Sequence, residues 1–279
     1  MEIACIIHSL DGGGAERVMA GLASRLAQRG HQVTLITLDD ATGDRHPVDA
    51  SVSRLPLRLM GESRGLWEKL INTRHRVRVV AQAIDDLAPE VVLSFCDRTN
   101  ILVLQAMRDR QVPVVIGERS DPAKQHLGAF WEYQRRRTYR RADRIVALTE
   151  SSRVTLGPLS KHRVEVIASA VDQPPRPSDR VTAAAKRRIL GAGRLAYEKG
   201  FDRLITSFAH IAKGHPDWTL RILGEGSQRV ALEQLAGELG VSDRVDLPGC
   251  VRPIWDELTD ATIFELPSRY EGFPSALLV

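Results

Sequence analysis

The chain has 279 residues, of which 43% are hydrophobic, and this is enough to fill the cores of two domains. The composition excludes an intrinsically disordered chain and a small fold held by disulfides. Cys5, Cys96 and Cys250 lie far apart in apolar stretches, so we expect reduced thiols in the core and a cytoplasmic protein. No apolar run reaches the roughly 20 residues of a membrane span, and Met1 leads directly into a strand pattern without a signal sequence.

Charge is distributed unevenly along the chain. The net charge is +4, and residues 1–175 hold 25 Lys and Arg against 21 Asp and Glu, whereas residues 176–279 hold 14 of each. Residues 64–78 (RGLWEKLINTRHRVR) have five bases against one acid, and residues 130–144 (FWEYQRRRTYRRADR) have six arginines against two acids. The excess of positive charge therefore lies in the first half of the chain, where these two stretches form local basic surfaces.

The first half alternates strands with amphipathic helices, which is the pattern of a parallel sheet covered by helices. Runs such as IACIIHS and RVEVIAS are continuously apolar or β-branched, as is typical of strands buried on both faces. The patterns predict strands at residues 2–8, 33–38, 91–95, 113–117, 144–148 and 164–167. They predict helices at residues 14–29, 65–87, 99–110, 124–142 and 150–158.

A second α/β domain follows a proline-rich connection. Residues 172–186 (DQPPRPSDRVTAAAK) have no core pattern, and we interpret them as an interdomain linker. Residues 187–279 supply about four strands, whereas an open doubly wound domain has about five or six, and the final PSALLV begins a helix too short to be stable by itself. We therefore expect an N-terminal domain at 1–175 and an incomplete second domain at 176–279.

Two glycine-rich turns are candidates for phosphate binding. In DGGGAER, residues 11–17, glycines would let the backbone approach an anion at a helix N-terminus, although a plain tight turn explains the motif equally well. The second turn is GAGRLA, residues 191–196. Neither meets the dinucleotide-binding pattern, because Arg17 replaces the third glycine of the first turn and YEKG separates the second from its helix. A dinucleotide-dependent oxidoreductase is therefore disfavoured.

Several blocks in this order resemble the family 4 glycosyltransferases, which have the GT-B fold of two Rossmann-like, doubly wound domains. GGGAERVMAGLASRLAQRGHQVTLITL resembles the start of the acceptor domain and GAGRLAYEKGFDRLITSFA that of the donor domain. LGEGSQRVALEQLAGELGVSDRVDLPG resembles the middle of the donor domain, and LPSRYEGFPSALLV its signature loop. The resemblance implies an α/β, GT-B enzyme that transfers a hexose or N-acetylhexosamine, with retention of configuration, from a nucleotide sugar. We expect a UDP-linked donor and a glycan or polyprenyl-lipid acceptor, in polysaccharide biosynthesis for the cell envelope.

The resemblance also assigns roles in the donor site. Arg194 and Lys199 match a basic pair that contacts the diphosphate, where fixed cations stabilise the charge developing on the leaving group, so we expect neither a metal nor a cofactor. Solvated surface bases are the alternative for both. Glu271 matches the first carboxylate of the family's Glu, seven residues, Glu signature and is expected to face the donor sugar. The expected catalytic residues are Glu271, Arg194 and Lys199, and the further donor-binding positions are Gly13, Gly14, Gly224, Gly272 and Phe273.

The second carboxylate of that signature, which binds the ribose hydroxyls in the family, falls at Val279. Valine accepts no hydrogen bond, and leaving a ribose hydroxyl without its partner costs about 1 to 3 kcal/mol of affinity. Either this chain binds ribose differently or its end reflects truncation. A truncated fragment that keeps the fold without turnover is therefore the alternative function, whereas a GT-B sugar epimerase is disfavoured by the terminal loop.

Acceptor-side candidates follow the strands of the first domain. Glu118 and Arg119 come directly after the strand pattern VPVVIG, and the resemblance suggests that they line the substrate cleft, together with Glu16. His126 and His8 are candidates for contacts with sugar hydroxyls, although a lone histidine is more often structural.

The two basic stretches allow several interpretations. Residues 65–87 would place apolar side chains on one helix face and bases with Trp67 on the other, which is typical of a helix at an anionic membrane surface. Residues 130–144 would do the same or bind a lipid pyrophosphate, and a solvated cationic face explains either stretch equally well. Nucleic acid is disfavoured, because aromatic residues at helical spacing in an α/β domain are more often core than base-stacking platforms. The expected location is the cytoplasm, at the inner face of the membrane if the lipid interpretation holds.

Overall fold

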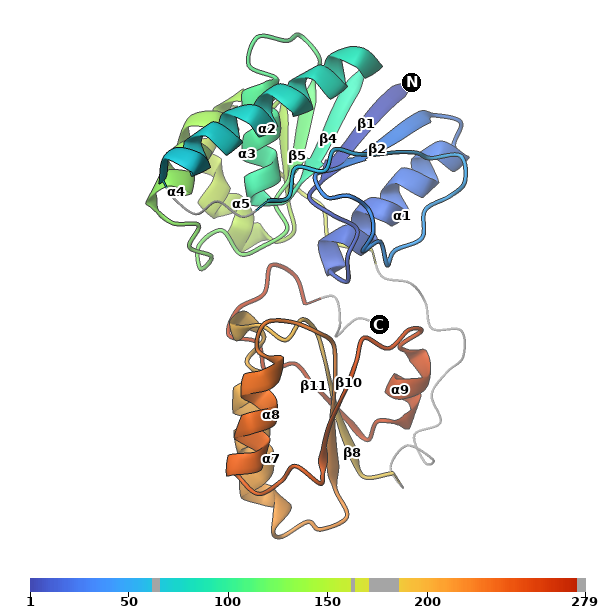
Figure 1. Cartoon of the computed structure of the whole chain (residues 1–279), viewed down its shortest axis with the longest axis vertical. Helices are drawn as coiled ribbons and strands as arrows, with labels where there is room; N and C mark the ends of the chain where they lie inside the picture. The colour runs from blue at the N-terminus through green and yellow to red at the C-terminus, as the bar shows by residue number, and fades with distance from the viewer. Residues whose placement is uncertain (62–65, 162–163, 171–185, 275–279) are drawn as a thin grey trace. The chain divides into compact units, whose positions relative to one another are not determined.

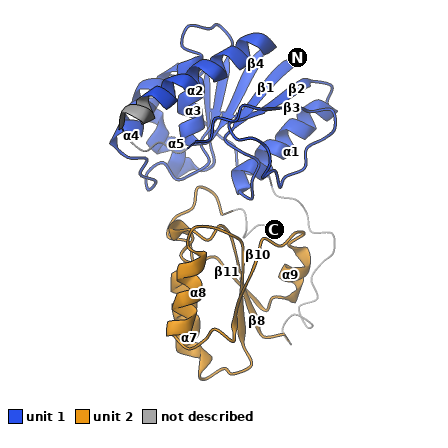
Figure 2. Cartoon of the chain, viewed as in Figure 1, with its two compact units in different colours: residues 1–170 blue, residues 171–279 orange. Residues whose placement is uncertain are grey.

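The computed structural model describes residues 1–61, 66–161, 164–170 and 186–274, without the side chains of residues 66–70. The chain divides into two compact units, unit 1 at residues 1–170 and unit 2 at residues 171–279 (Figure 2). Apart from Lys186 and Pro274, the expected linker at 172–186 and the helix expected to begin in PSALLV lie outside the described residues, and so do Val279 and the Trp67 side chain.

Unit 1 contains a seven-stranded parallel sheet in the order β3-β2-β1-β4-β5-β6-β7. Its strands are β1 (Glu2–Ile7), β2 (Gln32–Thr37), β3 (Ser53–Pro56), β4 (Val91–Phe95), β5 (Val114–Gly117), β6 (Arg144–Ala147) and β7 (Val164–Val166). Its helices are α1 (Gly14–Gln28), α2 (Leu66–Leu87), α3 (Asp97–Ala106), α4 (Ala129–Thr138) and α5 (Glu150–Leu156), with 3-10 turns at Tyr139–Arg141 and Gly157–Leu159.

Both faces of the central part of this sheet are buried, which explains why a strand such as β1 is apolar along nearly its whole length. Along β1, Ala4 and Ile6 pack into a core with α2 and α3, whereas Cys5 and Ile7 pack into a core with α1. Figure 1 shows α1 on one face of the sheet and α2 and α3 on the other. A strand covered on both faces loses the alternation of polar and apolar residues, so the continuous apolar runs correctly predicted a doubly wound sheet.

Unit 2 is built in the same way around a four-stranded parallel sheet in the order β10-β9-β8-β11. Its strands are β8 (Arg188–Ala192), β9 (Thr219–Leu223), β10 (Val245–Gly249) and β11 (Ile263–Glu265). Its helices are α7 (Phe201–Ala212), α8 (Arg229–Glu238) and α9 (Trp255–Asp260), with a 3-10 turn, η3, at Tyr197–Lys199. The helices α7 and α8 cover one face and α9 the other (Figure 1).

The structure differs from the sequence predictions in a few places. The strand β3 was not predicted, because its sequence SRLP is polar and contains a proline that only an edge strand tolerates. The helix predicted at 124–142 begins only at Ala129, because Gly128 has φ +87° and interrupts any helix there. Of the three thiols, Cys5 is buried as expected, but Cys96 is only half-buried and Cys250, after β10, is exposed, which corrects the expectation of three core cysteines.

Among the described residues, none of the helices combines the length and the hydropathy that crossing a lipid bilayer requires.

Candidate functional site

The strand order of each unit defines where a site can form. In an open parallel sheet, a crevice opens at the carboxyl ends of two adjacent strands whose connections run in opposite directions. In unit 1 these strands are β1 and β4, and in unit 2 they are β8 and β11. Lys199 follows β8 and Glu271 follows β11, so the chain brings both to the same point of the second sheet.

Lys199 and Glu271 are in direct contact. The Nζ atom of Lys199 lies 2.6 Å from Oε1 of Glu271, and the hydroxyl of Ser268 donates to the same oxygen at 2.6 Å. Both charged side chains are largely enclosed, with 23% and 19% of their surfaces exposed. Enclosed charges interact with each other and with a ligand more strongly than charges on an open surface. The ammonium of Lys199 and the carboxylate of Glu271 can each form further hydrogen bonds to a ligand.

The other donor positions predicted in unit 2 lie in the loops that follow β8, β9 and β11. Arg194 is exposed in the loop after β8, five residues before Lys199, while Gly272 and Phe273 follow Glu271 and are half-buried. Gly224, after β9, has φ +142°, and a Cβ atom there would overlap the carbonyl oxygen of Gly193. The loops after β8 and β9 therefore approach each other so closely that only glycine fits at this position.

In unit 1 the glycine-rich turn is occupied by a carboxylate. Gly13 caps α1, and a Cβ atom at Gly13 would overlap the carboxylate of Glu16, which folds back over the turn and is 2% exposed. The Nε2 atom of His8 lies 3.2 Å from Oε1 of Glu16, whereas a Cβ atom at Gly14 would meet no neighbour. A carboxylate therefore already faces this helix N-terminus, and phosphate binding by Gly13 and Gly14 stays a prediction.

Glu118 lies inside unit 1 rather than on its surface. Its carboxylate is 1% exposed and accepts hydrogen bonds from the hydroxyls of Tyr139, at 2.7 Å, and Ser120, at 3.1 Å. Burial, followed by the nearby charge of Asp97, raises the pKa of Glu118 to about 7. Glu118 supports the loop after β5 from within, and the expectation that it lines a substrate cleft stays a prediction.

Arg119, the next residue, lies over an aromatic ring at the same edge. Its guanidinium carbon is 5.1 Å from the centre of the Phe95 ring, and Nη2 donates to the hydroxyl of Ser169 at 2.6 Å. Burial lowers the pKa of Arg119. Electrostatic interactions with Glu16 and Arg17, after β1, and with Cys96, after β4, also act on Arg119, which places it near both loops. His126 is exposed in the loop before α4, and its role in sugar binding stays a prediction.

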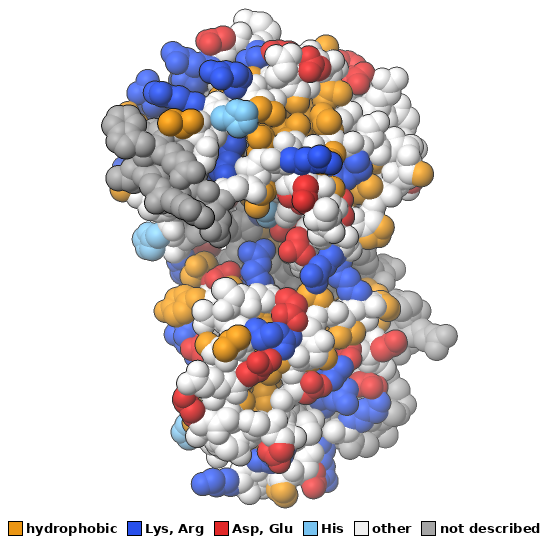
Figure 3. Space-filling view, viewed as in Figure 1, with side chains coloured by type: hydrophobic (Ala, Val, Ile, Leu, Met, Phe, Trp, Pro, Cys, Tyr) orange, Lys and Arg blue, Asp and Glu red, His pale blue; other side chains and the backbone are white. Residues whose placement is uncertain are grey.

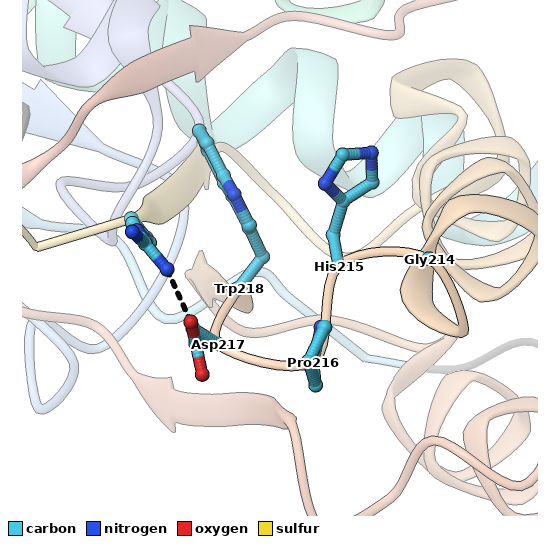
Figure 4. Close-up of a pocket in the computed structure, with 6 residues that line it drawn as sticks. Gly214, His215, Pro216, Asp217 and Trp218 are labelled. Carbon is cyan, nitrogen blue, oxygen red and sulfur yellow. Dashed lines mark hydrogen bonds and ion pairs between the residues drawn. The ribbon is translucent and has the colours of Figure 1, made fainter.

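Metal-ligand clusters and a surface hollow in unit 2 are other places where a site could form. Among the residues that the structure describes, no three His, Cys, Asp or Glu side chains gather as a metal ion would require. A hollow of about 400 Å³ in unit 2 is lined by Arg187 and residues 214–218, with Arg187 paired to Asp217 (Figure 4). These residues precede β8 and β9, so the hollow lies at the edge of the sheet opposite to Lys199 and Glu271.

Comparison with known proteins decides the family. Residues 12–174, more than half of the chain, match the family model described as Glycosyltransferase Family 4. Residues 177–278 match the model described as Glycosyl transferases group 1. The chain belongs to glycosyltransferase family 4.

Relatives of this family 4 glycosyltransferase include enzymes of glycan synthesis. The chain is 27% identical, over its whole length and 76% of the relative, to a Campylobacter jejuni GalNAc-alpha-(1->4)-GalNAc-alpha-(1->3)-diNAcBac-PP-undecaprenol alpha-1,4-N-acetyl-D-galactosaminyltransferase. Among solved structures, it is similar to WaaG, a glycosyltransferase involved in lipopolysaccharide biosynthesis, with a TM-score of 0.74, 16% identity and coverage of 99% and 77% of the two chains. It is also similar to Anabaena HepE in complex with UDP and glucose, with a TM-score of 0.68, 17% identity and coverage of 95% and 73%. The family models confirm the suspected family, and the similar structures confirm the GT-B fold.

Several contacts around the candidate site residues were not predicted from the sequence. Ser268 binds Glu271, Tyr139 binds Glu118, and Arg269 binds Asp202 in the loops around Lys199. Each pair except the first joins segments that are at least 20 residues apart. No spacing rule in a single sequence signals such contacts.

Proposed function

We propose that this chain transfers a hexose or N-acetylhexosamine, with retention of configuration, from a UDP-linked donor to a glycan or polyprenyl-lipid acceptor. The observation that carries the proposal is the contact of Lys199 with Glu271 at the point of unit 2 where the strand connections change direction. A cation and a carboxylate side by side suit a ligand that joins a diphosphate to a sugar.

Lys199, with Arg194 in the same loop, binds the diphosphate of the donor. As the glycosidic bond breaks, negative charge builds on the leaving diphosphate, and fixed cations at that place lower the barrier. In our proposal these two side chains supply the positive charge without a metal ion. HepE, a similar structure, is a complex with UDP and glucose, which supports UDP as the nucleotide.

Glu271 acts on the sugar side of the breaking bond. Its Oε2 atom is not engaged by Lys199 or Ser268, both of which bind Oε1. A carboxylate here can accept hydrogen bonds from sugar hydroxyls and stabilise the positive charge that develops at the anomeric carbon. Retention of configuration is the outcome that the resemblance to family 4 implies.

The acceptor side is a basic and apolar groove in unit 1. A hollow of about 480 Å³ lies among α2, α3 and α4 and is lined by Arg74, Val77, Arg78 and Phe130 with three uncharged polar residues. Phe130 and Tyr133 are exposed, and Figure 3 shows Lys and Arg side chains gathered on unit 1. Bases around an apolar floor suit an anionic lipid headgroup with its hydrocarbon chain, so we propose contact with an anionic membrane on its cytoplasmic side.

The relatives support this kind of acceptor. The Campylobacter enzyme acts, by its name, on a glycan linked through a diphosphate to undecaprenol, and WaaG is involved in lipopolysaccharide biosynthesis. A role in polysaccharide biosynthesis for the cell envelope follows from our proposal.

Release of UDP from UDP-hexoses and UDP-N-acetylhexosamines, in the presence of a polyprenyl-diphosphate-linked sugar, tests the proposed function. We expect one donor to be consumed and NMR of the product to show the anomeric configuration of the donor. Glu271→Gln should lower the rate at least about a hundredfold, whereas the exposed control Glu238→Gln on α8 should not change it. An inverted product contradicts retention, and a folded chain that neither binds nor consumes any nucleotide sugar supports the alternative of a fold without turnover.

A further inference from the structure

Arg269 ties the loop after β8 to the loop after β11. Its guanidinium donates to both carboxylate oxygens of Asp202, through Nη1 at 2.8 Å and Nη2 at 2.6 Å. Nη1 also donates to the carbonyl oxygen of Tyr197 at 2.8 Å, and the backbone N–H of Arg269 donates to the carbonyl oxygen of Glu198 at 2.8 Å. Arg269 therefore holds both the turn at Tyr197–Lys199 and the first turn of α7.

Packing fixes this side chain as firmly as its hydrogen bonds do. The guanidinium carbon of Arg269 lies 4.1 Å from the centre of the Tyr197 ring, and the side chain is only 14% exposed. Its partner Asp202 lies in the first turn of α7, where the helix N-terminus favours a carboxylate. Hydrogen bonds from Arg269 lower the pKa of Asp202, so the pair stays ionised at neutral pH.

The same two loops meet again at Gly200. Gly200 directly follows Lys199 and has φ +68°, a conformation that favours glycine. A Cβ atom at Gly200 would overlap the carbonyl oxygen of Pro267, which lies four residues before Glu271. The loops therefore approach each other without room for a side chain, beside the pair formed by Lys199 and Glu271.

We propose that Arg269 is a positioning residue of the donor site, which holds Lys199 and Glu271 at the separation that receives a sugar diphosphate. This inference rests on the proposed function. Nη1, Nη2 and the backbone N–H of Arg269 all bind the segment that follows β8, and Arg269 acts on the donor only through Lys199 and Glu271.

The clamp requires arginine rather than any cation. A guanidinium is a planar fork that binds both oxygens of one carboxylate and stacks on a ring at the same time. A lysine would keep the charge but lose the two-point contact with Asp202 and the flat packing on Tyr197. Substitution by lysine therefore separates the effect of geometry from the effect of charge.

Calorimetric titration of the full chain with UDP tests the clamp. We expect Arg269→Ala and Arg269→Lys to weaken UDP binding by about tenfold each, because small misplacements of binding groups are costly. Asp202→Asn should also weaken UDP binding, because it removes the charge of the carboxylate that Arg269 binds. Arg221→Ala is the matched control, because Arg221 makes an equivalent two-point contact with Glu257, at 2.9 Å for both bonds, between β9 and α9.

The double variant Lys199→Ala with Arg269→Ala distinguishes positioning from general destabilisation. If Arg269 acts through Lys199, the double variant binds UDP no more weakly than Lys199→Ala alone, whereas independent effects would add. Melting temperatures are measured for all variants. The Arg221→Ala variant should melt at a lower temperature than wild type but bind UDP within about twofold of the wild-type affinity.

Four results would overturn the inference: UDP affinity of Arg269→Ala within about twofold of wild type, an equal loss in Arg221→Ala, full rescue by Arg269→Lys, or additive losses in the double variant. If instead Lys199→Ala itself binds UDP normally, the proposed donor site fails, and the clamp fails with it. The two failures are therefore distinguishable.

Discussion

Glu118→Gln should remove a pH dependence from the stability of unit 1. The Glu118 carboxylate is 1% exposed, and hydrogen bonds from Tyr139 and Ser120 favour its charged form. Burial and the charge of Asp97 outweigh them and raise its pKa from the ordinary 4.5 to about 7. Between these two values the folded state holds a proton that the unfolded state has released.

The sign and size of the effect follow from this difference. Because the folded state binds more protons, the free energy of unfolding falls as pH rises from about 4.5 to about 7. At 1.36 kcal/mol per pH unit, the full contribution of Glu118 is about 3 kcal/mol. Glutamine does not titrate, so the variant should lack this decline while other titrating groups still act in both proteins.

Hydrogen–deuterium exchange measures this locally, which matters because a chain with two units need not unfold in one step. The opening free energies of peptides from β4 and β5 are compared at pH 5, 6, 7 and 8, after correction for intrinsic exchange. We expect the difference between wild type and Glu118→Gln to change by about 2.5 kcal/mol across this range, because part of the full contribution is already lost at pH 5, and the exposed control Glu238→Gln to show no such change. A difference that is constant with pH would refute the reasoning.

Two further predictions concern the loops of unit 2 and the groove of unit 1. Gly200→Ala should lower the free energy of unfolding by at least about 1 kcal/mol, because Gly200 has φ +68° and its Cβ atom would overlap Pro267. Gly214→Ala, where the nearest atom would be 3.7 Å away, should cost much less in the same thermal melts, and equal costs would contradict the close approach of the loops. The double variant Arg74→Ala with Arg78→Ala should bind vesicles containing anionic lipid about 30-fold more weakly, at about 1 kcal/mol per base. Co-sedimentation measures this, Arg29→Ala, at the exposed residue directly after α1, is the control, and unchanged binding would contradict the acceptor proposal.

Much of the fold was predictable because local pattern and burial agree. The apolar run of β1 packs into two cores at once, so neither face carries polar residues, and this signal is readable from sequence alone. The edge strand β3 has only one neighbouring strand and a polar sequence, so it gives no such signal. Gly128 delays the start of the helix predicted at 124–142 until Ala129, and its backbone angle is a property of the folded loop.

The candidate site, too, was predictable from the sequence only in part. Lys199 and Glu271 were found through their resemblance to family motifs, and the structure adds that their side chains meet at 2.6 Å. Arg269 and Asp202 lie within the family blocks but were not assigned a role, because their contact depends on two loops brought together by the adjacent strands β8 and β11. Contacts across a sheet edge follow from strand order, which one sequence does not specify.

Titration of the chain with UDP, with and without Lys199→Ala, tests the central claim most directly. A charge-assisted hydrogen bond contributes about 1.5 to 3 kcal/mol, so the loss of Lys199 should weaken UDP binding by about 10- to 150-fold. Lys213→Ala, which removes an exposed lysine at the end of α7, should leave the affinity unchanged, and GDP provides the comparison for the base. We predict saturable UDP binding that depends on Lys199 and not on Lys213. Equal UDP affinity of wild type and Lys199→Ala would contradict the donor site described here.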